Sequence, residues 1–122
     1  MKLHLNTTNG LNTITGHGAG HVLVNGARID RAVIVMLDKL IDPWPVGDFA
    51  SLSLADFANL IELKPELVVF GSGPAFRFPD ARIMAAFSAA RIGFDVMDTP
   101  AACRTYNVLM SEGRNVAAAL LV

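Results

Sequence analysis

The chain has 122 residues, a mass of 13.0 kDa and a formal net charge of −1. This length fits one domain, 1–122, and hydrophobic residues at 52% against 17% charged residues exclude a disordered chain. The near-zero net charge excludes a global electrostatic field that would draw the protein to nucleic acid or acidic lipid.

The cysteine content and the apolar runs bear on the compartment. A single cysteine, Cys103, cannot form an internal disulfide and is typical of a reducing compartment. Met1–Asn6 lacks the apolar core of a signal peptide, and the longest apolar runs are too short to span a bilayer. We therefore expect a soluble cytoplasmic protein with no nucleic-acid partner and no membrane span. The oligomeric state is left open, and a homo-oligomer is one alternative.

Residues 1–20 are polar and rich in glycine, with a short strand expected at Leu3–Leu5. Glycines at every second position argue against a helix around His17 and His21, because each glycine costs about 1 kcal/mol in a helix interior. The two histidines therefore lack the helical spacing of a metal-binding pair. We interpret them as loop or strand residues, and we expect no metal and no cofactor.

The segment His21–Asp30 carries the clearest local signal, an Asn25-Gly26 pair between two β-prone runs. This pair predicts a two-residue type I′ hairpin, because both central residues need a positive φ. The expected register places Val22 opposite Ile29, on the apolar face of the hairpin.

The middle of the chain is expected to contain one strand, a break and one helix. Asp42–Pro45 holds two prolines, which exclude both helix and sheet, and we expect its Trp44 to plug the edge of the core. Ser53 and Asp56 form a capping box that starts the helix, and Pro65 ends it. The strand is expected at Ala32–Leu37, and the buried stripe of the helix at Leu54, Phe57, Ala58 and Ile61.

From Leu67 onward the apolar pattern alternates between short continuous runs and helical stripes, which predicts an α/β fold. Strands joined by a helix are expected to be parallel. The second helix begins at about Asp80, presents Ile83, Met84, Phe87 and Ala90 to the core and stops at Gly93. The other expected elements are strands at Leu67–Phe70, Phe94–Met97 and Asn115–Leu121 and a helix over about Pro100–Glu112. We expect nearly complete burial for Phe57, Phe70, Ile83, Phe87 and Leu109.

A candidate site lies where the strand Phe94–Met97 runs into the last helix, with Thr99 as the expected N-cap and Pro100 at the first helical position. Such corners of open α/β sheets are common ligand sites. A glycine turn leaving the neighbouring strand meets this helix start, and its backbone amides are expected to accept an oxyanion. The candidate ligand-binding residues are Gly71, Gly73, Arg77, Asp98, Thr99, Cys103, Arg104 and Asn107.

Three members of this set have a plain structural alternative. Arg77 and Arg104 form either a clamp on a carboxylate or phosphate, or surface ion pairs with Asp95, Asp98 or Glu112. Cys103 is either a thiolate stabilised by the start of the helix, hence a candidate catalytic residue, or a small residue packed beneath it. No recognisable catalytic set accompanies them, which favours a protein that is not an enzyme.

Several segments of the C-terminal half resemble a family of small proteins of unknown function. The family includes a mitochondrial assembly factor for respiratory complex I (NADH:ubiquinone oxidoreductase) and the adipogenesis-associated protein of higher animals. The segments are Val69–Gly73, Arg77–Pro79, Val96–Thr99, Ala101–Asn107 and Glu112–Arg114, and the Cys-Arg-Thr-Tyr-Asn run is the most specific part.

The resemblance implies a three-layer α/β domain with a mixed central sheet and flanking helices. One alternative for this sheet has the last strand antiparallel to its neighbours. It implies no established reaction. It favours a binding module that assists the assembly of a respiratory or membrane complex, with respiratory-complex subunits as partners. The alternative is a small-anion-binding protein or thiol-dependent enzyme that uses Arg77, Cys103 and Arg104.

Overall fold

The computed structural model describes residues 10–122. It opens with a small antiparallel sheet of three strands, β1 (Ile14–Gly18), β2 (His21–Val24) and β3 (Ala27–Ile29). Asn25 and Gly26 have φ values of 53° and 83°, and Val22 pairs with Ile29, so the predicted hairpin and its register are confirmed. β1 was not expected, because its glycine-rich sequence carries little strand propensity. The strand expected at Leu3–Leu5 lies outside the described residues.

The central sheet has five strands in the order β5-β4-β8-β6-β7. β6 runs parallel to both β7 and β8, as predicted for strands joined by helices, whereas β8 runs antiparallel to β4. The sheet is therefore mixed, and the last strand is antiparallel to one neighbour alone. The strands are β4 (Val33–Met36), β5 (Lys39–Ile41), β6 (Leu67–Gly71), β7 (Gly93–Met97) and β8 (Val116–Leu120).

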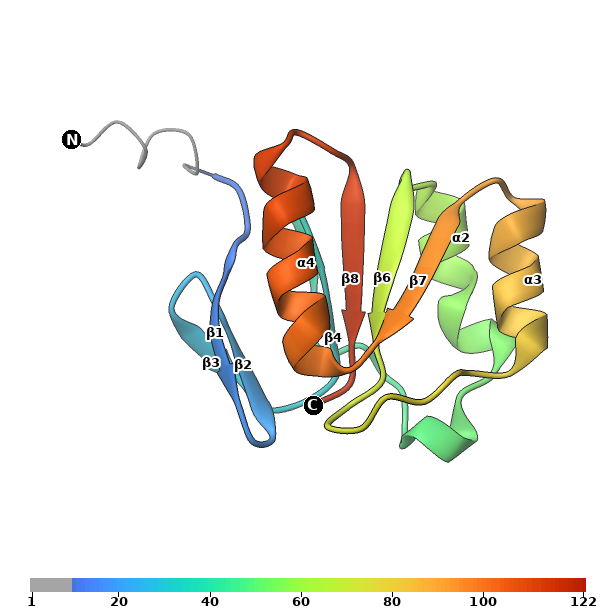
Figure 1. The fold of residues 1–122 in the computed structure, drawn as a ribbon, viewed down its shortest axis with the longest axis horizontal. Coiled ribbons are helices and arrows are strands. Elements are labelled where there is room, and N and C mark those ends of the chain that lie inside the picture. Colours follow the sequence, from blue (N-terminus) through green and yellow to red (C-terminus); the bar gives the residue numbers. More distant parts are fainter. Residues whose placement is uncertain (1–9) are drawn as a thin grey trace.

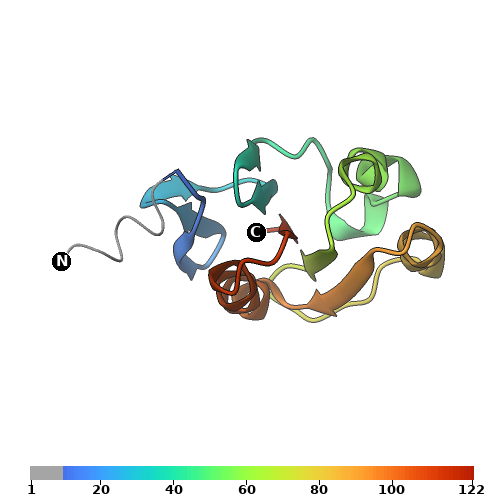
Figure 2. The same ribbon diagram turned by 90° about the horizontal axis from the view of Figure 1, so that it is seen from above.

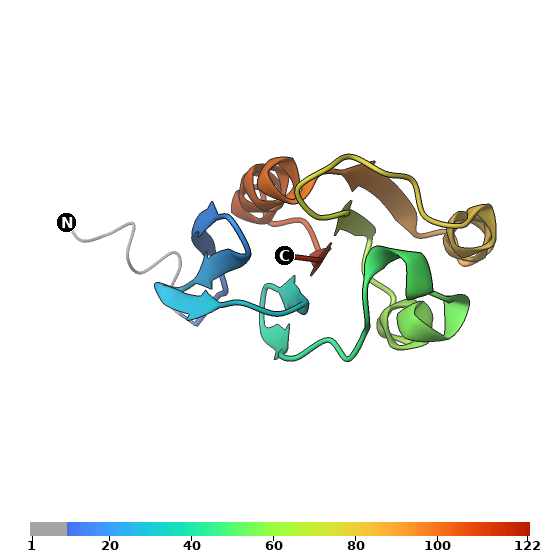
Figure 3. The same ribbon diagram turned by 90° about the horizontal axis from the view of Figure 1, so that it is seen from below.

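Helices and the small sheet cover the two faces of the central sheet, which gives the expected three layers (Figure 1). Views along the strands show α4 and the small sheet on one side and α2 and α3 on the other (Figures 2 and 3). The helical elements are two 3₁₀ turns, η1 (Phe49–Ser51) and η2 (Leu54–Phe57), and the helices α2 (Ala58–Leu63), α3 (Ala81–Ala89) and α4 (Thr99–Ser111).

Alternating side chains of the central strands divide the core into two clusters, because successive residues of a strand face opposite sides of a sheet. In β6, Val69 faces α4, whereas Val68 and Phe70 face α2 and α3. Phe57 lies at the centre of the second cluster, with Phe70, Phe87 and Phe94 rings 5.8 to 6.0 Å away. The predicted burial of Phe57, Phe70, Ile83 and Phe87 is confirmed, whereas Leu109 is only partly buried.

Trp44 is buried and donates its indole N–H to the carbonyl of Asp56 at 3.0 Å, so the expected plug is confirmed. The capping box is also present, with the Asp56 carboxylate accepting from the Ser53 N–H at 2.9 Å. The stripe of this helix was predicted wrongly: Leu54 and Ala58 are exposed, and Leu60 is buried instead. The helix starts as a 3₁₀ turn, whose three residues per turn shift the phase of the pattern.

Two helix ends also differ from the prediction. α3 stops because Arg91 takes a left-handed φ of 62°, so Gly93 is free to begin β7, and Ala90 is exposed. At the start of α4 the N-cap is Asp98 and not Thr99, because the Asp98 carboxylate accepts from the Ala101 N–H.

Candidate functional site at the carboxyl ends of the central strands

The turns that leave β6 and β7 meet at the predicted corner and bond directly to each other. The Gly73 N–H donates to Oγ1 of Thr99 at 2.9 Å, and the Thr99 N–H donates to the Gly73 carbonyl at 2.8 Å. The Ser72 N–H donates to the Met97 carbonyl at 2.9 Å, and the buried Thr99 hydroxyl donates to the Leu121 carbonyl at 2.5 Å. Thr99 thus joins the ends of three strands, β6, β7 and β8.

The amides at the start of α4 are likewise used within the protein. Asp98 accepts from the Ala101 N–H at 2.9 Å through its carboxylate and from the Ala102 N–H at 2.9 Å through its carbonyl. Pro100 has no N–H, and the Thr99 N–H is taken by Gly73. The expectation that amides at this corner point outward to receive an oxyanion is therefore wrong.

Gly71 and Gly73 serve this close approach between the two turns. A Cβ on Gly71 would lie 2.8 Å from Oγ1 of Thr99 and 3.0 Å from its Cα, a spacing that needs the glycine. Gly73 has a φ of +103°, in the region that residues with a Cβ rarely adopt. Packing and backbone geometry are sufficient reasons for both glycines.

Arg77 belongs to the loop between β6 and α3, and its side chain folds back onto that loop. Its guanidinium donates to the Ser72 carbonyl at 3.0 Å and lies 4.2 Å from the centre of the Phe49 ring. The Ser72 hydroxyl donates to the Ala75 carbonyl at 2.7 Å and accepts the Arg77 N–H at 3.1 Å. Arg77 and Ser72 together fix the shape of residues 72–77.

The loop presents an aromatic pair that was not among the residues predicted from the sequence. Phe76 and Phe78 are 54% and 62% exposed, and their ring centres lie 4.9 Å apart in an edge-to-face arrangement. Arg77 lies between them in the chain and is anchored inward. The sequence signal for this pair is two large apolar residues in a Gly/Pro-rich loop. Such a loop has no periodic side that faces the core, so large apolar residues in it indicate an exposed apolar surface.

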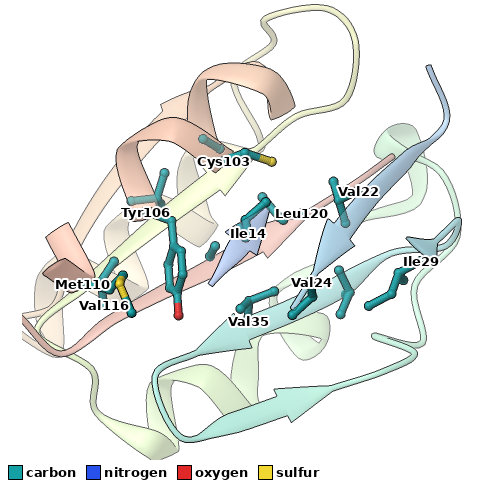
Figure 4. Packing of buried hydrophobic residues seen from close by; sticks show 14 residues of the cluster. Ile14, Val22, Val24, Ile29, Val35, Cys103, Tyr106, Met110, Val116 and Leu120 are labelled. Atoms are coloured by element: carbon teal, nitrogen blue, oxygen red, sulfur yellow. The ribbon is translucent and has the colours of Figure 1, made fainter. Parts of the chain in front are cut away.

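Cys103 lies inside the cluster between α4 and the small sheet, among Ile14, Tyr106 and Leu120 (Figure 4). It is 1% exposed, and burial raises the pKa of its thiol to about 11, against a small opposing effect of the Arg104 charge. A protonated, buried thiol fits the packing alternative for Cys103.

Tyr106 and Asn107 hold the N-terminal segment against α4. Asn107 accepts the Ile14 N–H at 3.0 Å through Oδ1 and donates to the Ile14 carbonyl at 2.6 Å through Nδ2. The Tyr106 hydroxyl donates to the Asn12 carbonyl at 2.8 Å, and burial raises its pKa, as does the charge of Asp38. Asn107 therefore occupies both hydrogen-bonding groups of Ile14, as a neighbouring strand would.

The predicted site residues thus form separate groups. Gly71, Gly73, Asp98 and Thr99 come together, and Gly73 and Thr99 also line a cleft of about 310 Å³. The Arg77 guanidinium lies beside Gly73, and the two residues line a second cleft, of about 350 Å³. Arg77 and Cys103 lie on opposite faces of the central sheet, since Phe49 packs on the α2–α3 side and Cys103 on the α4 side. Arg104 is exposed on α4. A ligand at this corner stays a prediction, without the free amide donors on which it was based.

Two further properties concern the described chain, residues 10–122. None of its helices has the length and apolar character needed to cross a membrane. Its His, Cys, Asp and Glu side chains form no group of three or more that could hold a metal ion.

The comparisons with known proteins give relatives over most of the chain. The chain is 31% identical over 110 residues to NADH dehydrogenase [ubiquinone] 1 alpha subcomplex assembly factor 3 of Bos taurus, covering 88% of this chain and 59% of that protein. It therefore spans about three fifths of the length of that relative. An uncharacterised protein of Rhodobacter capsulatus is 32% identical over 110 residues, which cover 88% of this chain and 82% of that protein.

The fold has a solved counterpart. A crystal structure of a Bordetella parapertussis protein superposes with a TM-score of 0.85 at 34% identity, covering 92% of this chain and 96% of that one. The model of one family, described as protein of unknown function (DUF498/DUF598), matches residues 14–121. That match includes every predicted site residue, and the chain belongs to the DUF498/DUF598 family.

Proposed function

We propose that this chain is a protein-binding module that assists the assembly of a respiratory complex, with subunits of NADH dehydrogenase as its partners. The similarity to assembly factor 3 over 110 residues carries the proposal. The cytoplasm stays the predicted compartment, in keeping with a single cysteine.

The contacts made by residues 103–107 support a scaffold function over catalysis. In Cys-Arg-Thr-Tyr-Asn, the thiol of Cys103 is buried and protonated, and Tyr106 and Asn107 bond to the backbone of the N-terminal segment. These groups are occupied in holding the fold, and none is presented to a substrate.

The Phe76–Phe78 pair supports a protein partner. Exposed aromatic residues are enriched at the energetic centres of protein interfaces. The loop is held in shape by Ser72 and Arg77, so little ordering entropy is lost when it binds. We propose this pair as the contact surface for the partner.

Capture of tagged protein from its native host tests the proposal. NADH dehydrogenase subunits should co-purify with the unmodified chain and with Val108→Ser, a control that removes an exposed apolar side chain from α4. The double variant Phe76→Ser/Phe78→Ser should lose the subunits while its melting temperature stays unchanged.

Deletion of the gene should lower the amount of assembled NADH dehydrogenase on native gels. A normal amount of the complex in the deletion strain, together with no captured subunits, would contradict the assembly function. Capture that survives the double variant would leave the assembly function standing and exclude the aromatic pair as its surface.

A further inference from the structure

A cleft of about 310 Å³ lies under the turn between β1 and β2, at the carboxyl ends of β6, β7 and β8. Clefts at this end of an α/β sheet commonly bind ligands, and binding pockets for small molecules start at about 300 Å³. Four separate segments contribute to the wall. The residues that matter below are His17, Ala19, Gly20, Pro74, Pro100 and Val122.

One part of the wall is apolar. Pro74, Pro100 and Val122 offer carbon surface, and the Thr99 hydroxyl beside them is already bonded to Gly73 and Leu121. The wall contains no acidic side chain. This part suits the hydrocarbon body of a small molecule.

The hairpin turn supplies hydrogen-bond donors. The N–H groups of Ala19 and Gly20 donate to no other group in the described part of the chain. His17 pairs with Val22, so its imidazole lies on the face of the small sheet that is turned toward α4. His21 also lines the cleft, but its ring lies over Gly18, with Nδ1 3.3 Å from the Ala19 carbonyl.

We propose that this cleft binds a small monocarboxylate with an apolar body. The carboxylate accepts hydrogen bonds from His17 and the Ala19–Gly20 turn, and the body lies against Pro74, Pro100 and Val122. This site differs from the corner predicted from the sequence, because it uses neither Arg77 nor Arg104. It does not depend on the assembly function, and either proposal can fail alone.

Titration of ¹⁵N-labelled protein with sodium hexanoate tests this site by NMR. Amide shifts should gather at residues 17–20, 73 and 99, and hexanoate should bind at least about tenfold more tightly than acetate, because it buries more methylene groups. Hexanoate should also bind more tightly than hexanol, the uncharged molecule of the same chain length.

Substitutions identify the carboxylate partner. His17→Ala should weaken hexanoate binding about tenfold and leave hexanol binding within twofold, since a charge-assisted hydrogen bond is lost. Arg28→Ala, which removes a cation from β3 outside the cleft, should change neither affinity. Equal affinity for hexanoate and hexanol, shifts centred elsewhere, or an equal loss in Arg28→Ala would overturn the proposal.

Discussion

At the scale of single residues, Asn107 and Thr99 from the predicted site form hydrogen bonds that hold segments of the fold together. Asn107 bonds both backbone groups of Ile14, and Thr99 bonds Gly73 and Leu121. Residues of this kind look functional in a sequence, because a polar side chain in an apolar segment needs a partner, and the partner here is the protein's own backbone.

Replacing Asn107 by leucine should lower the free energy of unfolding by about 2 kcal/mol, because two hydrogen bonds are lost and the Ile14 backbone groups lose their partners. Urea denaturation measures this loss, and exchange of the Ile14 amide hydrogen should accelerate. Arg104→Ala, an exposed neighbour on α4, is the control and should change stability by less than about 0.5 kcal/mol. An effect of Asn107→Leu as small as that would show that its hydrogen bonds to Ile14 do not stabilise the fold.

The Cys103 thiol should react slowly in the folded protein. Burial raises its pKa from 9.0 to about 11, so the thiolate fraction at pH 8 falls about 100-fold. Iodoacetamide at pH 8 should therefore modify the native protein at least about 100-fold more slowly than the urea-unfolded chain. Equal modification rates in the native and unfolded protein would show that Cys103 is a reactive thiol in the fold.

At the scale of elements, the start of α4 is fixed by the turn that leaves β6. The contact is close because Gly71 has no side chain: a Cβ there would lie 3.0 Å from the Cα of Thr99. Gly73 adds two hydrogen bonds to Thr99, one to its hydroxyl oxygen and one from its N–H. The helix is thereby held at the ends of the strands that it covers.

Gly71→Ala should destabilise the protein by about 1–3 kcal/mol, because the new Cβ would lie 2.8 Å from Oγ1 and 3.0 Å from Cα of Thr99. Thermal unfolding measures the loss, with Ala75→Ser in the exposed loop as a control for a small added group. A Gly71→Ala variant as stable as the parent would show that the turn and α4 can move apart at little cost.

At the scale of the whole molecule, the core is divided by the central sheet into an aromatic half and an aliphatic half. The aromatic half lies under α2 and α3, and the aliphatic half lies between α4 and the small sheet (Figure 4). The aliphatic half also contains the two buried ionisable groups Cys103 and Tyr106. Burial raises the pKa of both groups, so we expect the stability of the protein to depend on pH in the alkaline range.

Stability should fall as the pH rises from 9 toward 11. Burial raises the pKa of both the Cys103 thiol and the Tyr106 hydroxyl, so the unfolded chain loses these protons at lower pH than the folded chain. Above the unfolded value, 9.0 for the thiol, each pH unit therefore favours unfolding. Urea denaturation across this range measures the slope, which should be shallower in Cys103→Ala. A slope that is the same in both proteins would exclude the thiol as its source.

The local sequence by itself determined most of the elements of this protein. Asn25-Gly26 predicts its hairpin because few residues tolerate two positive φ angles, and Leu67–Phe70 predicts a strand covered on both faces because it is apolar throughout. Ser53 and Asp56 place the start of a helical segment because their reciprocal hydrogen bonds span only three residues. Such signals involve neighbours in the chain, so no tertiary contact is needed to interpret them.

Tertiary structure alone decided what the polar residues bind and which face each element presents. Asn107 and Ile14 are 93 positions apart, and Gly73 and Thr99 are 26 apart, so no local pattern reveals that they bond. β1 is a strand because β2 and α4 provide its partners, although its glycines argue against one. The turns after β6 and β7 form hydrogen bonds with each other because these strands are neighbours in the sheet. The backbone N–H groups that the sequence suggested as ligand donors are therefore bonded within the protein.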